Sequence, residues 1–296
     1  MTGRRRHGGS AKWNAPGVTE NSGFDEAAAT AKGVTENSGF DEAAATAKWL
    51  ELAPLLDRMM QRVGTDGEFG VASGSSLGGD DLASAPYQVS HAVRSCLMAA
   101  TDHLHAAKVL VVDQGTVHVA APSSLARGAL ETLSAAYWML HPVSRDERVT
   151  RALRWHAQNM RDADKAVRAR NLAGHLSLDD KLASLDEVAA KRALDRKAIR
   201  TGYNSSEAVK YADVNEQDLP LHVLLPWQIC SGFAHGRPWA YLGVSIREET
   251  KASESDVLGV RLTSSRARAL YPNLAAVQLL ERLLRLHARR AGTPLT

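Results

Sequence analysis

The chain has few cysteines and few aromatic residues. Its 296 residues include two cysteines, and phenylalanine, tryptophan and tyrosine together make up 5%. Cys96 and Cys230 lie far apart and neither belongs to a C-x-x-C pair, so no zinc site is expected. We interpret both as small buried hydrophobic residues in a reducing compartment, which predicts a cytoplasmic protein. The core is then expected to consist mainly of leucine, alanine and valine.

Long apolar runs and a large excess of one charge are also missing. The longest uncharged stretch, Leu219–Ala234, is too short to span a membrane and contains two prolines. The arginine-rich start of the chain is not followed by the apolar segment of a signal peptide. A formal charge of +3 does not by itself indicate a nucleic-acid partner, and the basic C-terminal region shows no helix-turn-helix pattern. We therefore expect neither a membrane nor DNA as a partner.

A tandem repeat occupies part of the N-terminal region. Residues 17–32 read GVTENSGFDEAAATAK, and residues 33–48 repeat them without a change. Units of 16 residues are shorter than those of solenoid proteins, and two copies cannot bury a core. Such short alanine runs form marginal helices in water. We therefore predict a disordered tail over 1–48 and a single helical domain over 49–296.

Helical periodicity dominates from Trp49 onward. Apolar residues recur at helical spacing, and serines, prolines and glycines mark the ends. The predicted helices span 49–63, 84–112, 122–140, 145–172, 179–199, 219–242 and 272–290, and Pro226 and Pro238 interrupt the helix over 219–242. Alternating apolar residues predict a β-hairpin near 243–263, and polar composition predicts loops over 64–80 and 203–217. The expected fold is all-α, a bundle of six to seven helices with one small hairpin.

Familiar catalytic motifs are absent or misplaced. A G-x-S-x-G match over 74–78 lies in a predicted loop, whereas the hydrolase motif requires a preceding strand. The phosphate-binding, dinucleotide-binding and zinc-protease motifs do not occur. His103 and His105 are two residues apart on a predicted helix and cannot share a metal ion. We expect neither a metal nor a cofactor.

One predicted helix carries regularly spaced arginines. They recur every three residues, at Arg145, Arg148, Arg151 and Arg154. Such a stripe could contact phosphates. Acidic residues lie between the arginines, however, and favour an ordinary solvated helix face with i,i+4 ion pairs.

The most unusual segment is WQICSGFAHGRPW, residues 227–239. It places Ser231, His235 and Arg237 in an apolar setting between Trp227 and Trp239. Ser231 and His235 share a helical face if the helix continues to His235. Histidine suits proton transfer near neutral pH, so His235 is a candidate catalytic residue. The competing interpretation is a hydrogen-bonded histidine packed between helices.

A charged pair interrupts the otherwise apolar helix predicted over 122–140. Arg127 and Glu131 are four residues apart, and a buried charge needs a partner. The simpler hypothesis is a structural ion pair. The alternative is that this face meets the helix of His235, which would form a polar pocket from Arg127, Glu131, Ser231 and His235.

The order of these motifs resembles the HEPN-like helical proteins of bacteria over about residues 85–290. The resemblance rests on R-x-x-x-E from Arg127 to Glu131, S-x-x-x-H-G beginning at Ser231, the hairpin and the closing helix. It implies a helical bundle that forms homodimers and acts on RNA or a nucleotide in bacterial defence or stress. Many members are metal-independent ribonucleases, and others are non-catalytic. The second possibility implies a partner-binding or regulatory module.

If the resemblance extends to catalysis, it implies cleavage of a phosphodiester by the RNA 2′-hydroxyl. His235 would act as general acid or base, Arg127 or Arg237 would stabilise the phosphorane, and Glu131 would orient Arg127. Ser231 and Trp239 would contact the ligand. The nuclease branch carries an arginine that is separated from its histidine by four to six residues, and no arginine precedes His235 at that spacing.

Overall fold

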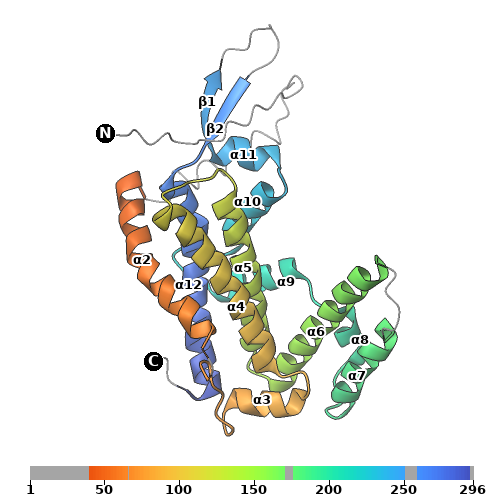
Figure 1. The fold of residues 1–296 in the computed structure, drawn as a ribbon. Coiled ribbons are helices and arrows are strands. Elements are labelled where there is room, and N and C mark those ends of the chain that lie inside the picture. Colours follow the sequence, from red (N-terminus) through yellow and green to blue (C-terminus); the bar gives the residue numbers. More distant parts are fainter. Residues whose placement is uncertain (1–39, 66, 171–175, 251–258, 294–296) are drawn as a thin grey trace. The chain divides into compact units, whose positions relative to one another are not determined.

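The computed structural model describes residues 40–65, 67–170, 176–250 and 259–293. Across these residues it contains eleven α-helices, one π-helical turn and one antiparallel two-stranded hairpin (Figure 1). The predicted all-α class with one small hairpin is confirmed. The helices outnumber the expected six or seven because several short helices lie where loops or longer helices were predicted.

The described chain groups into two compact units. The first is formed by residues within Met1–Asp57, His103–Arg127 and Leu225–Ala275, and the second by residues within Arg58–Asp102, Gly128–Leu224 and Ala276–Thr296. Four long helices contribute residues to both units: α2 (Glu42–Val63), α4 (Val89–Lys108), α5 (Ala121–Leu140) and α12 (Arg266–Ala291). The single domain expected over 49–296 stays a prediction.

Helix α2 begins inside the second copy of the repeat, which moves the predicted start of the helical part from Trp49 to Glu42. The Asp41 carboxylate accepts a hydrogen bond from the Ala44 amide at 2.7 Å, as an N-cap does. Buried Trp49 donates its indole N–H to the Arg266 carbonyl at 3.2 Å. Tertiary contacts therefore stabilise a segment that is too short to form a helix alone. The first copy of the repeat lies outside the described residues.

The first unit contains the hairpin. Its remaining elements are η1 (Val109–Asp113), α10 (Leu224–Ala234), α11 (Pro238–Val244), β1 (Ile246–Thr250) and β2 (Gly259–Thr263). Ile246 pairs with Thr263 in the antiparallel register, which confirms the hairpin predicted near 243–263 (Figure 1). Pro238 is the first residue of α11, so this proline divides the predicted 219–242 helix.

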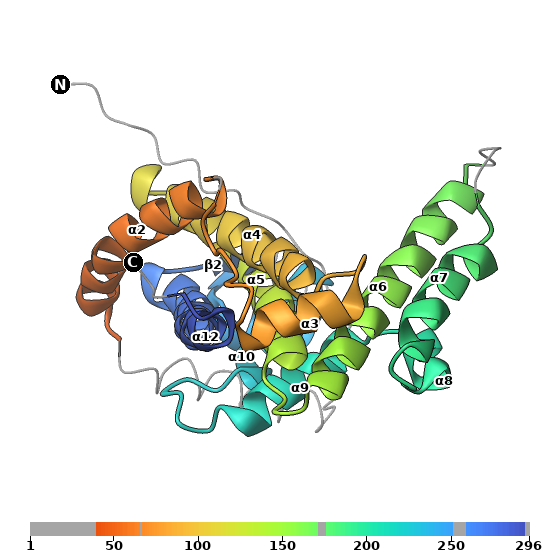
Figure 2. The same ribbon diagram turned by 90° about the horizontal axis from the view of Figure 1, so that it is seen from below.

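The second unit contains the shorter helices. They are α3 (Ser76–Ser84), α6 (Arg145–Arg168), α7 (Leu178–Ala190), α8 (Arg196–Thr201) and α9 (Ser205–Asn215). Helices α6, α7 and α8 pack against one another, as both views show (Figures 1 and 2). The Ser144 side chain caps α6 by accepting from the Glu147 amide, at the start that the sequence predicts for this helix.

The loops predicted over 64–80 and 203–217 are partly wrong, because each contains a helix. Ser75 caps α3 by accepting from the Gly78 amide at 3.0 Å. Asn204 caps α9 by accepting from the Ser206 amide at 2.9 Å. In both segments the polar residues that suggested a loop are N-caps. The predicted 179–199 helix is likewise divided, into α7 and α8.

The core of the second unit is mainly aliphatic, as expected. The fully buried side chains include Leu130, Leu133, Leu153 and Leu283. The large side chain of Trp138 is also buried in this core. In the described part of the chain, no helix has both the length and the apolar character needed to cross a membrane.

Candidate functional site

Four of the predicted site residues lie together in sequence at the junction of α10 and α11. Helix α10 ends at Ala234, and the His235 amide still donates to the Ser231 carbonyl at 3.0 Å. His235 and Arg237 are exposed, whereas Ser231 and Trp239 are half-buried. The predicted apolar setting of His235 is therefore wrong, because the helix ends before this residue and the turn presents it to solvent.

The start of α5 lies close to α10 at Cys230. Burial raises the pKa of the Cys230 thiol, and a hydrogen bond from Ser123 and the charge of Arg127 oppose that rise. The first turn of α5 therefore packs against α10 through Ser123 and Cys230, within the first unit. Glu131, the fourth member of the predicted polar pocket, belongs to the second unit.

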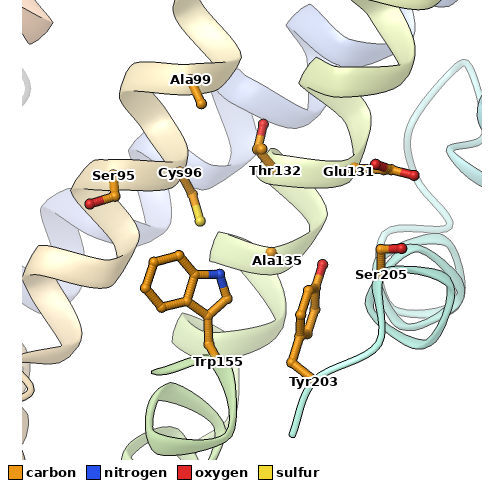
Figure 3. Close-up of a pocket in the computed structure, with 9 residues that line it drawn as sticks. All are labelled: Ser95, Cys96, Ala99, Glu131, Thr132, Ala135, Trp155, Tyr203 and Ser205. Carbon is orange, nitrogen blue, oxygen red and sulfur yellow. The ribbon is translucent and has the colours of Figure 1, made fainter. Parts of the chain in front are cut away.

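A pocket of about 260 Å³ opens in the second unit (Figure 3). Its lining comes from four parts of the chain: Ser95, Cys96 and Ala99 of α4, Glu131, Thr132 and Ala135 of α5, Trp155 of α6, and Tyr203 and Ser205 at the start of α9. In the view of Figure 3 the rings of Trp155 and Tyr203 lie on either side of Ala135. The pocket therefore has aromatic walls with a few polar groups, the usual composition of a ligand site.

The titratable groups of this pocket are a carboxylate, a phenol and a thiol. Burial raises the pKa of the Cys96 thiol to about 12, which keeps it protonated near neutral pH. Burial also raises the pKa of Tyr203, and Cys96 and the negative charges of Glu131 and Glu207 raise it further. Tyr203 is therefore a neutral phenol that lies in the negative field of Glu131.

Two hydroxyl groups of the lining donate hydrogen bonds to backbone carbonyls. Ser95 Oγ donates to the His91 carbonyl at 3.0 Å. Thr132 Oγ1 donates to the Gly128 carbonyl at 2.8 Å. A hydroxyl has one proton and two lone pairs, so each of these groups offers only acceptor capacity to a ligand.

A tight turn places Tyr203 at the pocket. Gly202 adopts a positive φ of 81°, and a Cβ atom there would lie 2.5 Å from the Arg161 guanidinium. Arg154 Nε donates to the Gly202 carbonyl at 2.8 Å, and its guanidinium also pairs with Glu207 at 3.2 Å. Arg154 of the predicted basic stripe therefore fixes the turn that carries Tyr203.

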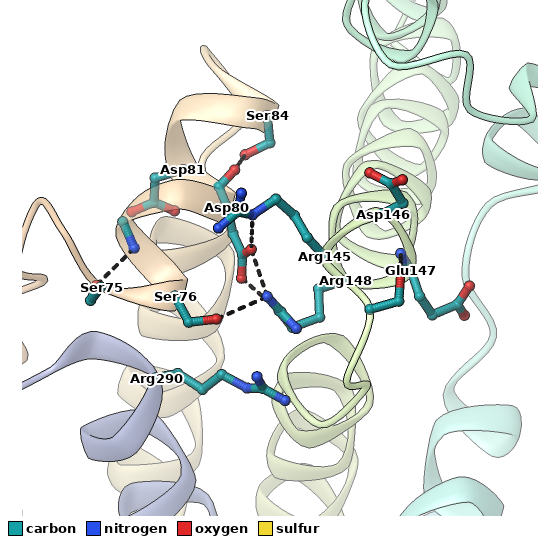
Figure 4. Close-up of polar contacts among 12 residues, drawn as sticks. Ser75, Ser76, Asp80, Asp81, Ser84, Arg145, Asp146, Glu147, Arg148 and Arg290 are labelled. Atoms are coloured by element: carbon teal, nitrogen blue, oxygen red, sulfur yellow. Dashed lines mark hydrogen bonds and ion pairs between the residues drawn. The ribbon is translucent and has the colours of Figure 1, made fainter.

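The arginine stripe was predicted to lie on a solvated helix face, and this prediction is wrong for Arg148. This side chain is buried, and it donates to the Asp80 carboxylate and to Ser76 (Figure 4). It also donates to the Pro142 and Val143 carbonyls. The network joins α3 to α6. The serine of the G-x-S-x-G match, Ser76, thus has a structural partner at 3.0 Å.

One residue of this pocket, Glu131, is a candidate from the sequence because of its charge on an apolar helix. Trp155 and Tyr203 are not, because they lie far from Glu131 in sequence and belong to segments of ordinary composition. No local pattern brings such residues together, since tertiary packing alone does so.

Groups of three or more histidine, cysteine or acidic side chains placed to hold a metal ion do not occur within the described ranges. In comparisons with known proteins, no family model, no curated protein and no solved structure matches this chain. The pocket and the α10–α11 turn are therefore the observations on which a function can be proposed.

Proposed function

We propose that this protein is a non-catalytic helical module whose second unit binds a small ligand. The observation that supports the proposal is the pocket lined by Glu131, Trp155 and Tyr203. Aromatic walls with a few converging polar groups are typical of small-molecule sites. A thiol nucleophile must be deprotonated, and burial keeps Cys96 protonated, which favours binding over covalent chemistry.

The size and charge of the pocket limit the ligand. Its volume of about 260 Å³ is below the range of about 300–1,000 Å³ that is usual for drug-sized ligands. Glu131 is the one charged residue of the described lining, and none of the lining residues is basic. A phosphate group would therefore meet the Glu131 carboxylate and no basic residue of the lining, which disfavours a nucleotide here.

Saturation-transfer NMR tests this proposal on the full chain. The probes are benzylamine, benzyl alcohol and benzoate, and the blocking variant is Ala99→Trp, which places an indole in the pocket. Leu82→Trp is the matched control, because Leu82 is 80% exposed on α3 and does not line the pocket. At least one probe should give a signal with the wild type and Leu82→Trp that Ala99→Trp loses. Equal signals from all three proteins, or none, would contradict the proposal.

The α10–α11 turn supports a second proposal, that the first unit acts on RNA as the HEPN-like resemblance implies. His235 and Arg237 are both exposed, with half-buried Trp239 two residues further on, so a polymer could reach all three. Incubating RNA with the full chain in a chelator tests it. Cleavage that His235→Ala abolishes would support the proposal, and RNA that stays intact with the wild type would contradict catalysis. The homodimer stays a prediction.

A further inference from the structure

We propose that the pocket of the second unit recognises a neutral carbonyl group on a small aromatic molecule, as in an aryl ketone or an aryl amide. The inference rests on the proposed ligand-binding function and names the ligand class. Three properties of the described lining support it: two hydrogen-bond donors that await an acceptor, the lack of a basic residue, and flat apolar surfaces.

The two donors are the indole N–H of Trp155 and the phenol O–H of Tyr203, which both line the pocket. An indole nitrogen can only donate. Tyr203 keeps its proton near neutral pH, because burial raises the pKa of its hydroxyl group. In Figure 3 the indole nitrogen and the phenol oxygen both lie beside Ala135, which is between them in this view. Both donors therefore face the same part of the pocket.

Ring contacts outside the lining hold both side chains. The ring centroid of Trp155 lies 5.1 Å from that of His156 in an edge-on contact, and the ring centroid of Tyr203 lies 5.6 Å from that of Trp138. The donors are thus positioned before a ligand arrives, so binding does not incur the entropy cost of ordering them.

Neither donor has a hydrogen-bond acceptor among the residues that the structure describes. The carboxylates of Glu131 and Glu207 act on Tyr203 through their charge alone, and Glu131 has its own interaction within the chain. A ligand that displaces water from the pocket without offering an acceptor would leave both donors unpaired, which costs binding free energy. A carbonyl oxygen has two lone pairs and can accept from both.

The charge of the lining favours a neutral acceptor over a carboxylate. None of the lining residues within the described ranges is basic. The arginine that precedes Trp155 is engaged elsewhere, since Arg154 pairs with Glu207 at 3.2 Å and donates to the Gly202 carbonyl at 2.8 Å. A carboxylate would lose its hydration without gaining a cation, and this costs more than burying a hydrogen-bonded neutral carbonyl. The two donors thus select a ketone or an amide over an acid.

The rest of the lining suits a flat aromatic ring. Cys96, Ala99 and Ala135 are small and apolar, and burial raises the pKa of the Cys96 thiol to about 12, so it stays uncharged near neutral pH. The rings of Trp155 and Tyr203 add aromatic walls (Figure 3). Aromatic rings pack favourably in offset or edge-on contacts. A phenyl ring that carries a carbonyl group therefore fits both the apolar surfaces and the donors.

Three planar compounds of nearly the same shape test the inference. Acetophenone carries the neutral carbonyl, α-methylstyrene has a CH2 group in place of that oxygen, and benzoate carries a charged carboxylate. Titrations followed by saturation-transfer NMR at pH 7 measure the dissociation constant of each compound with the full chain. We expect acetophenone to bind at least about fivefold more tightly than α-methylstyrene, which leaves both donors unpaired, and at least about tenfold more tightly than benzoate.

Variants of the two donors connect this preference to the pocket. Tyr203→Phe removes one donor and keeps the ring, so acetophenone should bind about fivefold more weakly and α-methylstyrene as before. Trp155→Phe removes the other donor, and the ratio of the two affinities should fall in the same way. The matched control is Tyr211→Phe, because Tyr211 hydrogen-bonds His141 and does not line the pocket. Both affinities should stay at their wild-type values in this control.

The outcomes separate the inference from the proposed function. If α-methylstyrene or benzoate binds as tightly as acetophenone, or if Tyr203→Phe leaves the affinity for acetophenone unchanged, the inference is overturned and the ligand-binding function stands. The same holds if benzylamine or benzyl alcohol binds and acetophenone does not. If none of these compounds binds, the proposed function itself fails. Should circular dichroism show that Tyr203→Phe is unfolded, the wild-type affinities and Trp155→Phe decide.

Discussion

The Asp80 carboxylate accepts two hydrogen bonds from the Arg148 guanidinium, from Nε at 2.6 Å and from Nη2 at 2.8 Å. Both side chains are almost completely buried. Arg145 adds a third bond to the same carboxylate at 3.1 Å, at the edge of the network. This two-point pairing joins α3 to α6 across 68 residues of sequence, and it holds a helix whose composition predicts a loop.

Removal of one partner from this pair should be strongly destabilising. Asp80→Asn leaves the buried Arg148 charge without its anion, and breaking a buried pair in this way costs about 3–5 kcal/mol. Urea denaturation measures the loss. Asp146→Asn is the matched control, because Asp146 is exposed and pairs with Arg192 at the surface, where about 0–1 kcal/mol is expected. Equal effects of the two variants would contradict the account of Asp80.

Acid should destabilise the fold through His156. Burial, with a smaller contribution from His91, lowers the pKa of His156 to about 4. The unfolded state then binds a proton first, so stability is lost as the pH falls from about 6.5 towards 4, by about 1.4 kcal/mol per unit and about 3 kcal/mol in total.

Replacement of His156 by an aromatic residue that does not titrate tests this pH dependence. His156→Phe keeps an aromatic ring beside Tyr87, whose ring centroid lies 5.2 Å away, and removes the titration. The unfolding free energy of the variant should therefore change less between pH 6.5 and 4 than that of the wild type. His118→Gln, at an exposed position, should behave like the wild type. An unchanged pH slope in His156→Phe would sink the explanation.

The exposed position of His235 predicts a small effect on stability. Substitutions at such surface positions usually change stability by about 0.5 kcal/mol or less, so His235→Ala should melt within about 2 °C of the wild type. A hydrogen-bonded core histidine, the competing interpretation from the sequence, would instead lower the melting temperature clearly. Differential scanning calorimetry distinguishes the two interpretations. A melting temperature of His235→Ala more than about 5 °C below that of the wild type would support a histidine packed in the core.

Gly232 should tolerate no side chain. A Cβ atom there would lie 2.6 Å from the Ala240 Cβ and 2.9 Å from the Trp239 ring, so α10 and α11 would have to separate. Gly232→Ala should cost about 1–3 kcal/mol. Gly236 has open space around its Cβ position, so Gly236→Ala should show only the backbone strain of its positive φ, about 1–2 kcal/mol. If Gly232→Ala proves neutral, the close packing of α10 on α11 is wrong.

The sequence predicted those elements that local signals define. Ser144 marked the start of α6, Pro238 marked the start of α11, and the alternating residues around Ile246 marked the hairpin. It failed at α3, where glycines and serines are typical of a loop. The bond from Arg148 to Asp80 that stabilises this helix comes from a distant segment.

In the candidate sites, too, local signals identify single residues, whereas distant contacts decide what surrounds them. Arg127 and Glu131 could be singled out because they are charged residues on an apolar helix. Their surroundings could not, since tertiary packing alone brings Tyr203 into the same pocket as Glu131 and brings Cys230 within the electrostatic influence of Arg127. His235 was misplaced because a single residue at the end of α10 decides between burial and exposure.

Electron density from a crystal of the full chain soaked in benzylamine tests the central claim most directly. The account predicts density for the ligand inside the pocket of the second unit, with its ring against Trp155. An empty pocket in a crystal where benzylamine is bound elsewhere would contradict it.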